Sequence, residues 1–389
     1  MRFEQFMEYT YQDQGERSRF INNTKRIVVK IGTQLLRKQD PQKRIEEFIA
    51  IIAQLRNQGY EVIIVSSGAI GIGMTTLGIS KRPKNIAPLQ AYAAIGQCHL
   101  MRFYESACEK AGFHCAQLLL TAADLHDDER NLKVTQCIEA LLSENVLPVI
   151  NENDSVCVDE IKIGDNDTLA AYVATMLQAD LTILLTTIDG FHEYLPEQKQ
   201  LGKRLSTVKS LNSTILSMAQ GTDGNPYSTG GMITKLKAAH IITTCGSAML
   251  IIDGYQFTNL IDALHGNDTG TLFVPAEKQK LHNHKRFLAF FSDTAGELII
   301  DEGAQKALCD QNKSLLPGGI IGCRGLFHRN DTVRIINTDN QEIARGIVNF
   351  AYDEMAKICG IKSGSIASTL QLKNPPHEVV HKDNLVLTF

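Results

Sequence analysis

Short apolar runs recur along the first 275 residues, and most end at glycine or small polar residues. Such runs, rich in Val, Ile and Leu, are typical of strands buried on both faces of a sheet. Between them apolar residues return every three or four positions, as on one helix face; one helix begins at Asp40-Pro41 and ends before Gly59. The strands are expected at 26–32, 61–65, 115–120, 146–150, 181–186 and 248–252. This alternation predicts an α/β fold, a mostly parallel open sheet sandwiched by helices.

After about residue 275 the pattern changes to short strands separated by turns. These strands are expected at 297–301, 318–321, 332–337 and 342–348, with a helix around 304–310. They predict a small β-rich domain. We divide the chain into an N-terminal extension (1–24), an α/β domain (25–277), a linker (278–295), the β-rich domain (296–373) and a tail (374–389). The extension is polar, and we expect it to be flexible or loosely docked.

Composition narrows the class of protein. A hydrophobic content of 43% and a charged content of 21% are ordinary for a soluble globular protein. The net charge of −4 does not call for nucleic acid or an anionic membrane as partner. Nine scattered cysteines without a CxxC pair indicate reduced thiols in a cytoplasmic protein, rather than disulfides or a zinc site. With no apolar run of 18 residues and no secretory signal, we expect no membrane association.

Acidic and amide side chains gather just after the strand expected at 146–150, in the strings NEND (151–154) and GDND (164–167). In an open α/β sheet, ligands bind at the carboxyl ends of the strands. A folding core has no use for so many short polar side chains, so we expect this cluster to hold a ligand. A divalent metal site is one alternative, although the spacing is not that of an EF-hand loop. The mixture of Asn and Asp suits an ammonium group and carboxylates at least as well.

Two lysines stand beside glycine-rich turns. Lys30 lies in an apolar strand that ends at Gly32, and Lys235 follows Gly230-Gly231 where a helix is expected to begin. A lysine at a helix N-terminus opposes the helix dipole unless an anion binds there. Two cations and a carboxylate cluster are the parts that phosphoryl transfer needs. Lys30 could instead be a strand-end lysine whose ammonium group reaches solvent. The segment that ends at Lys235 could be an ordinary surface turn, because its spacing is not that of a P-loop. Ser67 lacks the GxSxG context of a nucleophile.

Five motifs, in this order, resemble the amino acid kinase family: VVKIGT (28–33), SSGAIGIG (66–73), LPVINENDSV (147–156), EIKIGDNDTLAA (160–171) and STGGMITKLKAA (228–239). The resemblance covers about residues 26–275 and is specific to the branch that acts on L-glutamate. The later segments AGELIIDEGAQKAL, SLLPGGI and EIARGIV resemble a PUA domain, which that branch often carries. The resemblance implies transfer of the γ-phosphoryl group of ATP to the γ-carboxylate of L-glutamate, the first step of proline synthesis.

The resemblance also implies roles for single residues. Lys30 and Lys235 would contact the transferring phosphoryl group, and Asp167 would orient both lysines. Glutamate would be held by Ser67, Asp154 and Asn166. The nucleotide site would comprise Lys30, Thr186, Thr187, Thr229, Gly230, Gly231, Met232, Ile233, Thr234 and Lys235. Magnesium would be held mainly by the nucleotide phosphates, with no direct protein ligand. Family members commonly carry Asp where this chain has Thr187. This change removes a carboxylate near the nucleotide and would affect contacts with its base or ribose.

Two alternatives remain open at this point. Another member of the family, acting as an acetylglutamate, carbamate or uridylate kinase, is disfavoured by the NEND and GDND motifs. RNA binding is suggested by the PUA resemblance, but residues 285–373 carry 11 Lys+Arg against 10 Asp+Glu, too balanced for a strong phosphate footprint. The family resemblance further implies a homo-oligomer and feedback inhibition by proline at or near the glutamate site.

Overall fold

The computed structural model describes residues 9–12, 14–37, 40–156, 165–195, 200–211, 215, 218–219, 231–275, 283–309, 311 and 313–388. The chain divides into two compact units. The first comprises residues 1–125 and 129–280, and the second comprises residues 126–128 and 281–389. Within the described residues, no helix is both long and apolar enough to cross a bilayer.

Over its described residues, the first unit contains a nine-stranded sheet in the order β1-β9-β11-β10-β6-β2-β3-β5-β4. From β10 to β4 all neighbouring strands run parallel. The strands are β1 (Tyr9–Thr10), β2 (Arg26–Ile31), β3 (Glu61–Val65), β4 (Cys115–Leu120), β5 (Leu147–Glu152), β6 (Leu181–Thr186), β9 (Thr207–Val208), β10 (Ala248–Asp253) and β11 (Thr271–Phe273); β7 (His192–Leu195) and β8 (Gln200–Arg204) form a separate hairpin. The predicted mostly parallel α/β sheet is confirmed.

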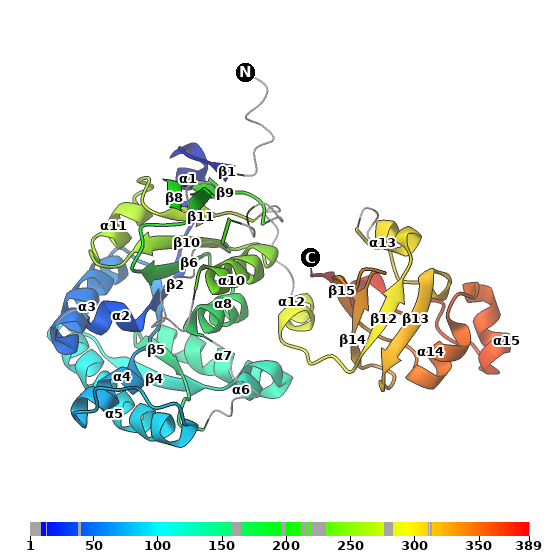
Figure 1. The fold of residues 1–389 in the computed structure, drawn as a ribbon, viewed down its shortest axis with the longest axis horizontal. Coiled ribbons are helices and arrows are strands. Elements are labelled where there is room, and N and C mark those ends of the chain that lie inside the picture. The colour runs from blue at the N-terminus through cyan, green and yellow to red at the C-terminus, as the bar shows by residue number, and fades with distance from the viewer. Residues whose placement is uncertain are drawn as a thin grey trace. The chain divides into compact units, whose positions relative to one another are not determined.

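Helices cover both faces of this sheet, with α3 and α11 on one side and α8 and α10 on the other (Figure 1). The helices are α1 (Gln14–Ile21), α2 (Thr33–Arg37), α3 (Pro41–Asn57), α4 (Ala69–Thr76), α5 (Ile86–Lys110), α6 (Ala122–His126), α7 (Asp128–Ser143), α8 (Asn166–Met176), α10 (Met232–Thr244) and α11 (Asn259–Leu264). The predicted start of α3 is confirmed, because the Asp40 side chain accepts a hydrogen bond from the Gln42 backbone N–H at 3.2 Å.

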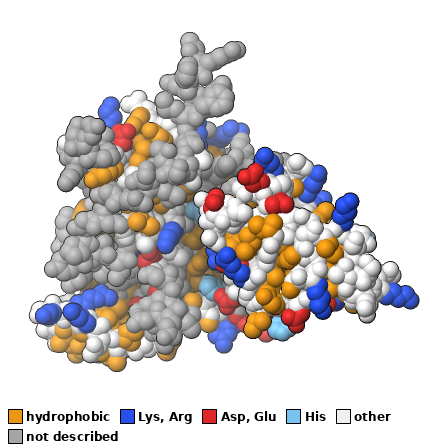
Figure 2. Space-filling model, turned by 45° about the vertical axis from the view of Figure 1, so that its right-hand side comes forward, with side chains coloured by type: hydrophobic (Ala, Val, Ile, Leu, Met, Phe, Trp, Pro, Cys, Tyr) orange, Lys and Arg blue, Asp and Glu red, His pale blue; other side chains and the backbone are white. Residues whose placement is uncertain are grey.

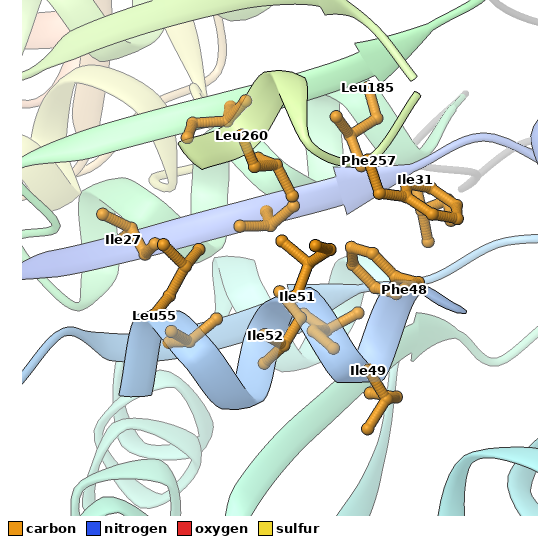
Figure 3. Packing of buried hydrophobic residues seen from close by; sticks show 14 of the residues in the cluster. Ile27, Ile31, Phe48, Ile49, Ile51, Ile52, Leu55, Leu185, Phe257 and Leu260 are labelled. Atoms are coloured by element: carbon orange, nitrogen blue, oxygen red, sulfur yellow. The ribbon is translucent and has the colours of Figure 1, made fainter. Parts of the chain in front are cut away.

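The core of the first unit forms where the apolar face of α3 meets the sheet. Phe48, Ile52 and Leu55 lie at helical spacing and are fully buried. Figure 3 shows them facing β2, with Phe257 beside Phe48. The ring centroids of Phe48 and Phe257 are 5.1 Å apart. This packing holds β2, and therefore the strand end that carries Lys30, in a fixed place.

The N-terminal extension is part of the first unit, so the expected loose docking is wrong for its described residues. β1 pairs antiparallel with β9 (Figure 1). Arg17 of α1 is fully buried. Its guanidinium donates to the backbone oxygens of Gly270 at 2.6 Å, Ser206 at 2.7 Å and Thr269 at 3.0 Å. The polar composition of the extension concealed this contact, since an arginine satisfied by backbone carbonyls can be buried.

The second unit is the predicted β-rich domain, which is confirmed. Its described residues form a five-stranded sheet in the order β13-β12-β14-β15-β16. The strands are β12 (Gly296–Ile300), β13 (Ile320–Gly325), β14 (Thr332–Ile336), β15 (Glu342–Ile347) and β16 (Leu385–Leu387), and the helices are α12 (Asn283–Phe290), α13 (Glu302–Cys309), α14 (Tyr352–Ile358) and α15 (Ile366–Leu370). Residues that we assigned to the linker and the tail contribute α12 and β16, and β16 pairs with β15.

Charged side chains of the second unit pair with one another along the sheet. Arg334 contacts Glu297 at 2.8 Å and Glu342 at 2.7 Å, and Arg345 contacts the same Glu342 at 2.8 Å. On the face of this unit seen in Figure 2, basic side chains are interspersed with acidic and apolar ones. This surface therefore does not present the continuous basic stripe that is typical of a nucleic-acid interface.

Candidate active site

The residues singled out in the sequence gather where neighbouring parallel strands end. Lys30 is the penultimate residue of β2, Ser67 lies two residues after β3, and Thr186 is the last residue of β6. Since β6, β2, β3 and β5 are adjacent and parallel, their carboxyl ends meet at one edge of the sheet. The helices α8 and α10 pack against each other, and they begin at Asn166 and Met232. The candidate residues thus come from six elements to one region.

Asp167 joins the two lysines. The Lys30 Nζ lies 2.5 Å from the Asp167 Oδ1, and the Lys235 Nζ lies 3.0 Å from the Asp167 Oδ2. The Asp167 side chain is 1% exposed, whereas each lysine side chain keeps 11% exposure. The Thr234 hydroxyl lies at 3.4 Å from the same Oδ2. One buried carboxylate therefore holds two cations from distant parts of the chain side by side.

The surroundings of Asp167 favour its ionised form. Burial by itself would raise the pKa of this carboxyl, but the charges and hydrogen bonds of Lys30 and Lys235 outweigh burial and lower the pKa from 3.8 to about 2. Asp167 is therefore an anion at neutral pH. This anion also explains how Lys235 can lie in the first turns of α10, where the helix dipole disfavours a cation.

Asp165 has a different role from Asp167. It is the N-cap of α8, and its Oδ1 accepts hydrogen bonds from the backbone N–H groups of Asp167 and Thr168, both at 2.8 Å. This cap satisfies two N–H groups that the first turn of a helix leaves unpaired. It also fixes the direction of the first turn, which carries Asn166 and Asp167 next to each other.

Asn166 joins residues at the ends of β3 and β5. Its Nδ2 donates to the Ser67 Oγ at 2.7 Å, to the Ser66 backbone oxygen at 2.8 Å and to the Asn151 Oδ1 at 3.1 Å. The Asn166 Oδ1 is buried and has no hydrogen-bond partner among the described residues. A buried amide oxygen without a partner is costly, so this atom suits a ligand that donates a hydrogen bond.

A hollow of about 160 Å³ lies on the same side. Its wall includes Glu152, Asp154, Gln97, Gln117 and Ala69. The volume is well below the ~300–1,000 Å³ of sites for drug-sized ligands, so it suits a small molecule. Asp154 therefore lies in the wall of a small cavity.

Glycines let α4 and α5 approach closely enough to shape this hollow. A Cβ atom on Gly73 would lie 1.9 Å from the Tyr92 oxygen, and one on Gly96 would lie 1.8 Å from the Ala69 oxygen. No side chain fits at either position, so the two backbones are in direct contact. The contact places Ala69 of α4 beside Gln97 of α5.

The sequence model of the amino acid kinase family matches residues 25–253, and the PUA domain matches residues 296–370. The chain belongs to the amino acid kinase family. The glutamate 5-kinase of Geobacter sulfurreducens is 41% identical over 374 residues, covering 95% of this chain and 100% of that protein. The glutamate 5-kinase of Caldanaerobacter subterraneus subsp. tengcongensis is 43% identical over 366 residues, covering 93% and 97%. The predicted resemblance is confirmed.

The residues of this amino acid kinase that the sequence analysis expected at the nucleotide site lie at the end of β6 and at the start of α10. Thr186 is buried at the end of β6, where its Oγ1 accepts from the Ile188 N–H at 3.1 Å, and Thr187 next to it is exposed. Gly231 is the N-cap of α10, and Met232, Ile233, Thr234 and Lys235 form the first turn. Thr229 and Gly230 lie outside the described residues. The positive end of α10 thus adjoins the two lysines, as an anion site requires.

Among the described residues of this kinase, no group of three His, Cys, Asp or Glu side chains is placed so that it could hold a metal ion. Both oxygens of Asp167 face lysines, which leaves this carboxylate poorly suited to bind a cation directly. The arrangement suits an anionic group between the lysines.

Two contacting residues, Gln97 and Tyr104, were not singled out from the sequence. Gln97 accepts a hydrogen bond from the Asn151 Nδ2 at 3.0 Å, and the Tyr104 hydroxyl lies 2.9 Å from the Ser66 Oγ. Asn151 belongs to the NEND motif, which the sequence analysis expected to hold a ligand. Gln97 and Tyr104 lie in α5, more than 40 residues from that motif, and nothing in the local pattern marks them.

Proposed function

We propose that this amino acid kinase transfers the γ-phosphoryl group of ATP to the γ-carboxylate of L-glutamate, the first step of proline synthesis. The observation that carries the proposal is the placement of Lys30 and Lys235 on the two oxygens of one buried aspartate. The choice of glutamate is supported by relatives named glutamate 5-kinase that align over nearly the whole chain.

In this reaction the protein itself need not form or break covalent bonds. A carboxylate oxygen is already nucleophilic, so no general base is needed. The enzyme must hold two anions in line and neutralise the charge that develops on the transferred group. In our proposal Lys30 and Lys235 contact the phosphoryl oxygens, and Asp167 keeps the two lysines in position.

The nucleotide would bind beside the N-terminus of α10. We assign Thr186, Thr187 and residues 229–235 to this site, with the helix dipole favouring the phosphates. Magnesium would be held mainly by the nucleotide phosphates, where it would add positive charge. Since the two lysines occupy Asp167, we propose no direct protein ligand for the metal.

Ser67, Asp154 and Asn166 would hold glutamate. The Asn166 Oδ1 is buried without a partner among the described residues, which supports its use as an acceptor for the ammonium group. Asp154 lines the small hollow and adds negative charge on that side. These residues would orient the γ-carboxylate toward the two lysines.

Two further statements rest on the family resemblance. Proline, which shares the ammonium and carboxylate groups of glutamate, would inhibit by binding at or near the glutamate site. The chain would form a homo-oligomer. A cytoplasmic location follows from the cysteine usage and stays a prediction. RNA binding by the PUA domain has little support, because the arginines of its sheet are paired with carboxylates.

A direct assay tests the main proposal. The purified protein is incubated with ATP and magnesium and with glutamate, N-acetylglutamate or aspartate, and the acyl phosphate is trapped with hydroxylamine. We expect product with glutamate, far less with the other two acceptors, and a decrease when proline is added. A preference for N-acetylglutamate, or ADP release that does not depend on the acceptor, would contradict the proposal.

A further inference from the structure

The side-chain amide of Gln97 joins Asn151 to the hollow. We propose that Gln97 determines acceptor specificity by presenting its NH2 group to the carboxylate of the amino acid that is not phosphorylated. This inference rests on the proposed function and adds a residue to its acceptor site. It follows from the polarity of three linked groups: the Glu152 backbone, the Asn151 amide and the Gln97 amide.

The three groups form a chain of hydrogen bonds from the Glu152 backbone through Asn151 to Gln97, which we call the relay. It begins at a group whose polarity cannot change. The backbone N–H of Glu152 can only donate, and it donates to the Asn151 Oδ1 at 2.9 Å. The Asn166 Nδ2 donates to the same oxygen at 3.1 Å. Because the Asn151 oxygen accepts from both, the amide of Asn151 cannot be turned around without losing two hydrogen bonds.

The next step transmits that polarity to α5. With its oxygen committed, Asn151 has only its NH2 group left, and this group donates to the Gln97 Oε1 at 3.0 Å. The oxygen of Gln97 is therefore committed as well, and its NH2 group is what remains for a ligand. Gln97 is 9% exposed and lines the hollow, so this donor is held in place where a ligand in the hollow can reach it.

The hollow is lined by groups that favour opposite charges. Gln97 and the N-terminal residue of α4, Ala69, line it, and an amide NH2 group and the positive end of a helix favour an anion. Glu152 and Asp154 also line it, and carboxylates favour a cation. A free α-amino acid carries both charges on neighbouring atoms, so it matches this hollow better than an N-acetylated one does.

Two variants with a matched control test the role of Gln97. Gln97→Glu replaces the donor by a carboxylate, and Gln117→Glu adds the same charge to the same hollow from a residue outside the relay. We expect Gln97→Glu to raise the KM for glutamate by at least ~30-fold, the scale for losing a hydrogen bond to a charged group and gaining repulsion. Gln117→Glu should raise it less than ~5-fold. The KM for ATP should stay within twofold of the wild-type value in both.

A third variant tests the relay itself. Asn151→Asp leaves an oxygen to accept from Glu152 and Asn166 but offers Gln97 a second oxygen, so Gln97 must turn its NH2 group away from the hollow. We expect the KM for glutamate to rise ~10-fold although the direct contact is untouched. Equal KM values in Gln97→Glu and Gln117→Glu, a parallel rise in the KM for ATP, or an unchanged KM in Asn151→Asp would overturn the inference. Absence of glutamate phosphorylation by the wild-type protein would instead overturn the proposed function.

Discussion

Asp167 and Arg17 are both ionised groups buried in the first unit, and they differ in what surrounds them. Arg17 is fully buried, and its donors are directed at backbone carbonyls and at Asp268, 3.4 Å away. Asp167 is equally buried, but its partners are two lysines that each keep 11% exposure. The first charge is enclosed by the protein, whereas the second is paired with cations that can still reach a ligand.

The difference teaches how a buried charge can serve structure or chemistry. Backbone carbonyls satisfy Arg17 without leaving any charge for another molecule, so it anchors α1 to the segments around β9 and β11. At Asp167 the two positive charges exceed the one negative charge, and the surplus favours an anionic ligand. Removing a partner should therefore affect stability at Arg17 and turnover at Asp167.

The largest stability effect is expected at Arg17. Arg17→Met leaves the carbonyls of Ser206, Thr269 and Gly270 buried without their donor, and should lower the free energy of unfolding by about 3–5 kcal/mol. Urea denaturation followed by circular dichroism measures this change. Arg19→Met is the control, because Arg19 is exposed on the same helix. Equal denaturation midpoints for the two variants would show that α1 is not anchored through Arg17.

The next effect concerns turnover. Lys235→Ala should lower kcat for glutamate phosphorylation by at least ~100-fold, the scale for losing one preorganised charge at the transferring group. Its free energy of unfolding should fall by no more than about 2 kcal/mol, since Asp167 keeps Lys30. Lys237→Ala is the control, because Lys237 is exposed on the same helix. Near-wild-type turnover of a folded Lys235→Ala protein would exclude this lysine from the chemistry.

Acid should weaken the first unit through Asp167. The pKa of this carboxyl is about 2 in the folded protein against 3.8 as its ordinary value. Because the folded-state value is lower, the contribution of about 2 kcal/mol is complete above pH ~5 and is lost as pH falls through the folded-state pKa. The difference in unfolding free energy between the wild-type protein and Asp167→Asn should shrink by roughly half between pH 5 and pH 3. A constant difference would mean that the lysines do not lower this pKa.

The smallest effect is expected for a neutral contact beside the charged centre. Burial raises the pKa of Tyr104, so its hydroxyl stays protonated, 2.9 Å from the Ser66 Oγ. Tyr104→Phe should cost about 1 kcal/mol of stability and raise the KM for glutamate only a few-fold. Tyr92→Phe on the same helix serves as the control. A loss of turnover as large as that of Lys235→Ala would contradict the view that charges dominate this site.

Much of the fold could be predicted because local pattern and tertiary position agree. The strand at Cys115–Leu120 was expected with the bounds that the structure has, and α3 begins at the predicted cap. Lys30 and Lys235 could be proposed because a charge in an apolar or glycine-rich context is unusual, whereas the role of Asp167 was implied by the family resemblance. The docking of the extension could not be predicted, since the partners of Arg17 lie 189 to 253 residues away.

The amino-acid sequence by itself determined the alternation of strands and helices, the change to a β-rich second part and the family motifs. These follow from short-range periodicity and from residue types that need no partner to be recognised. Only the tertiary structure gave the distances at which Asp167 pairs with the two lysines, and only it decided that Arg17 anchors the N-terminus and that the amides of Asn151 and Gln97 point in one direction. Hydrogen-bond polarity and the pairing of buried charges depend on which groups meet in space, and the spacing along the chain does not record that.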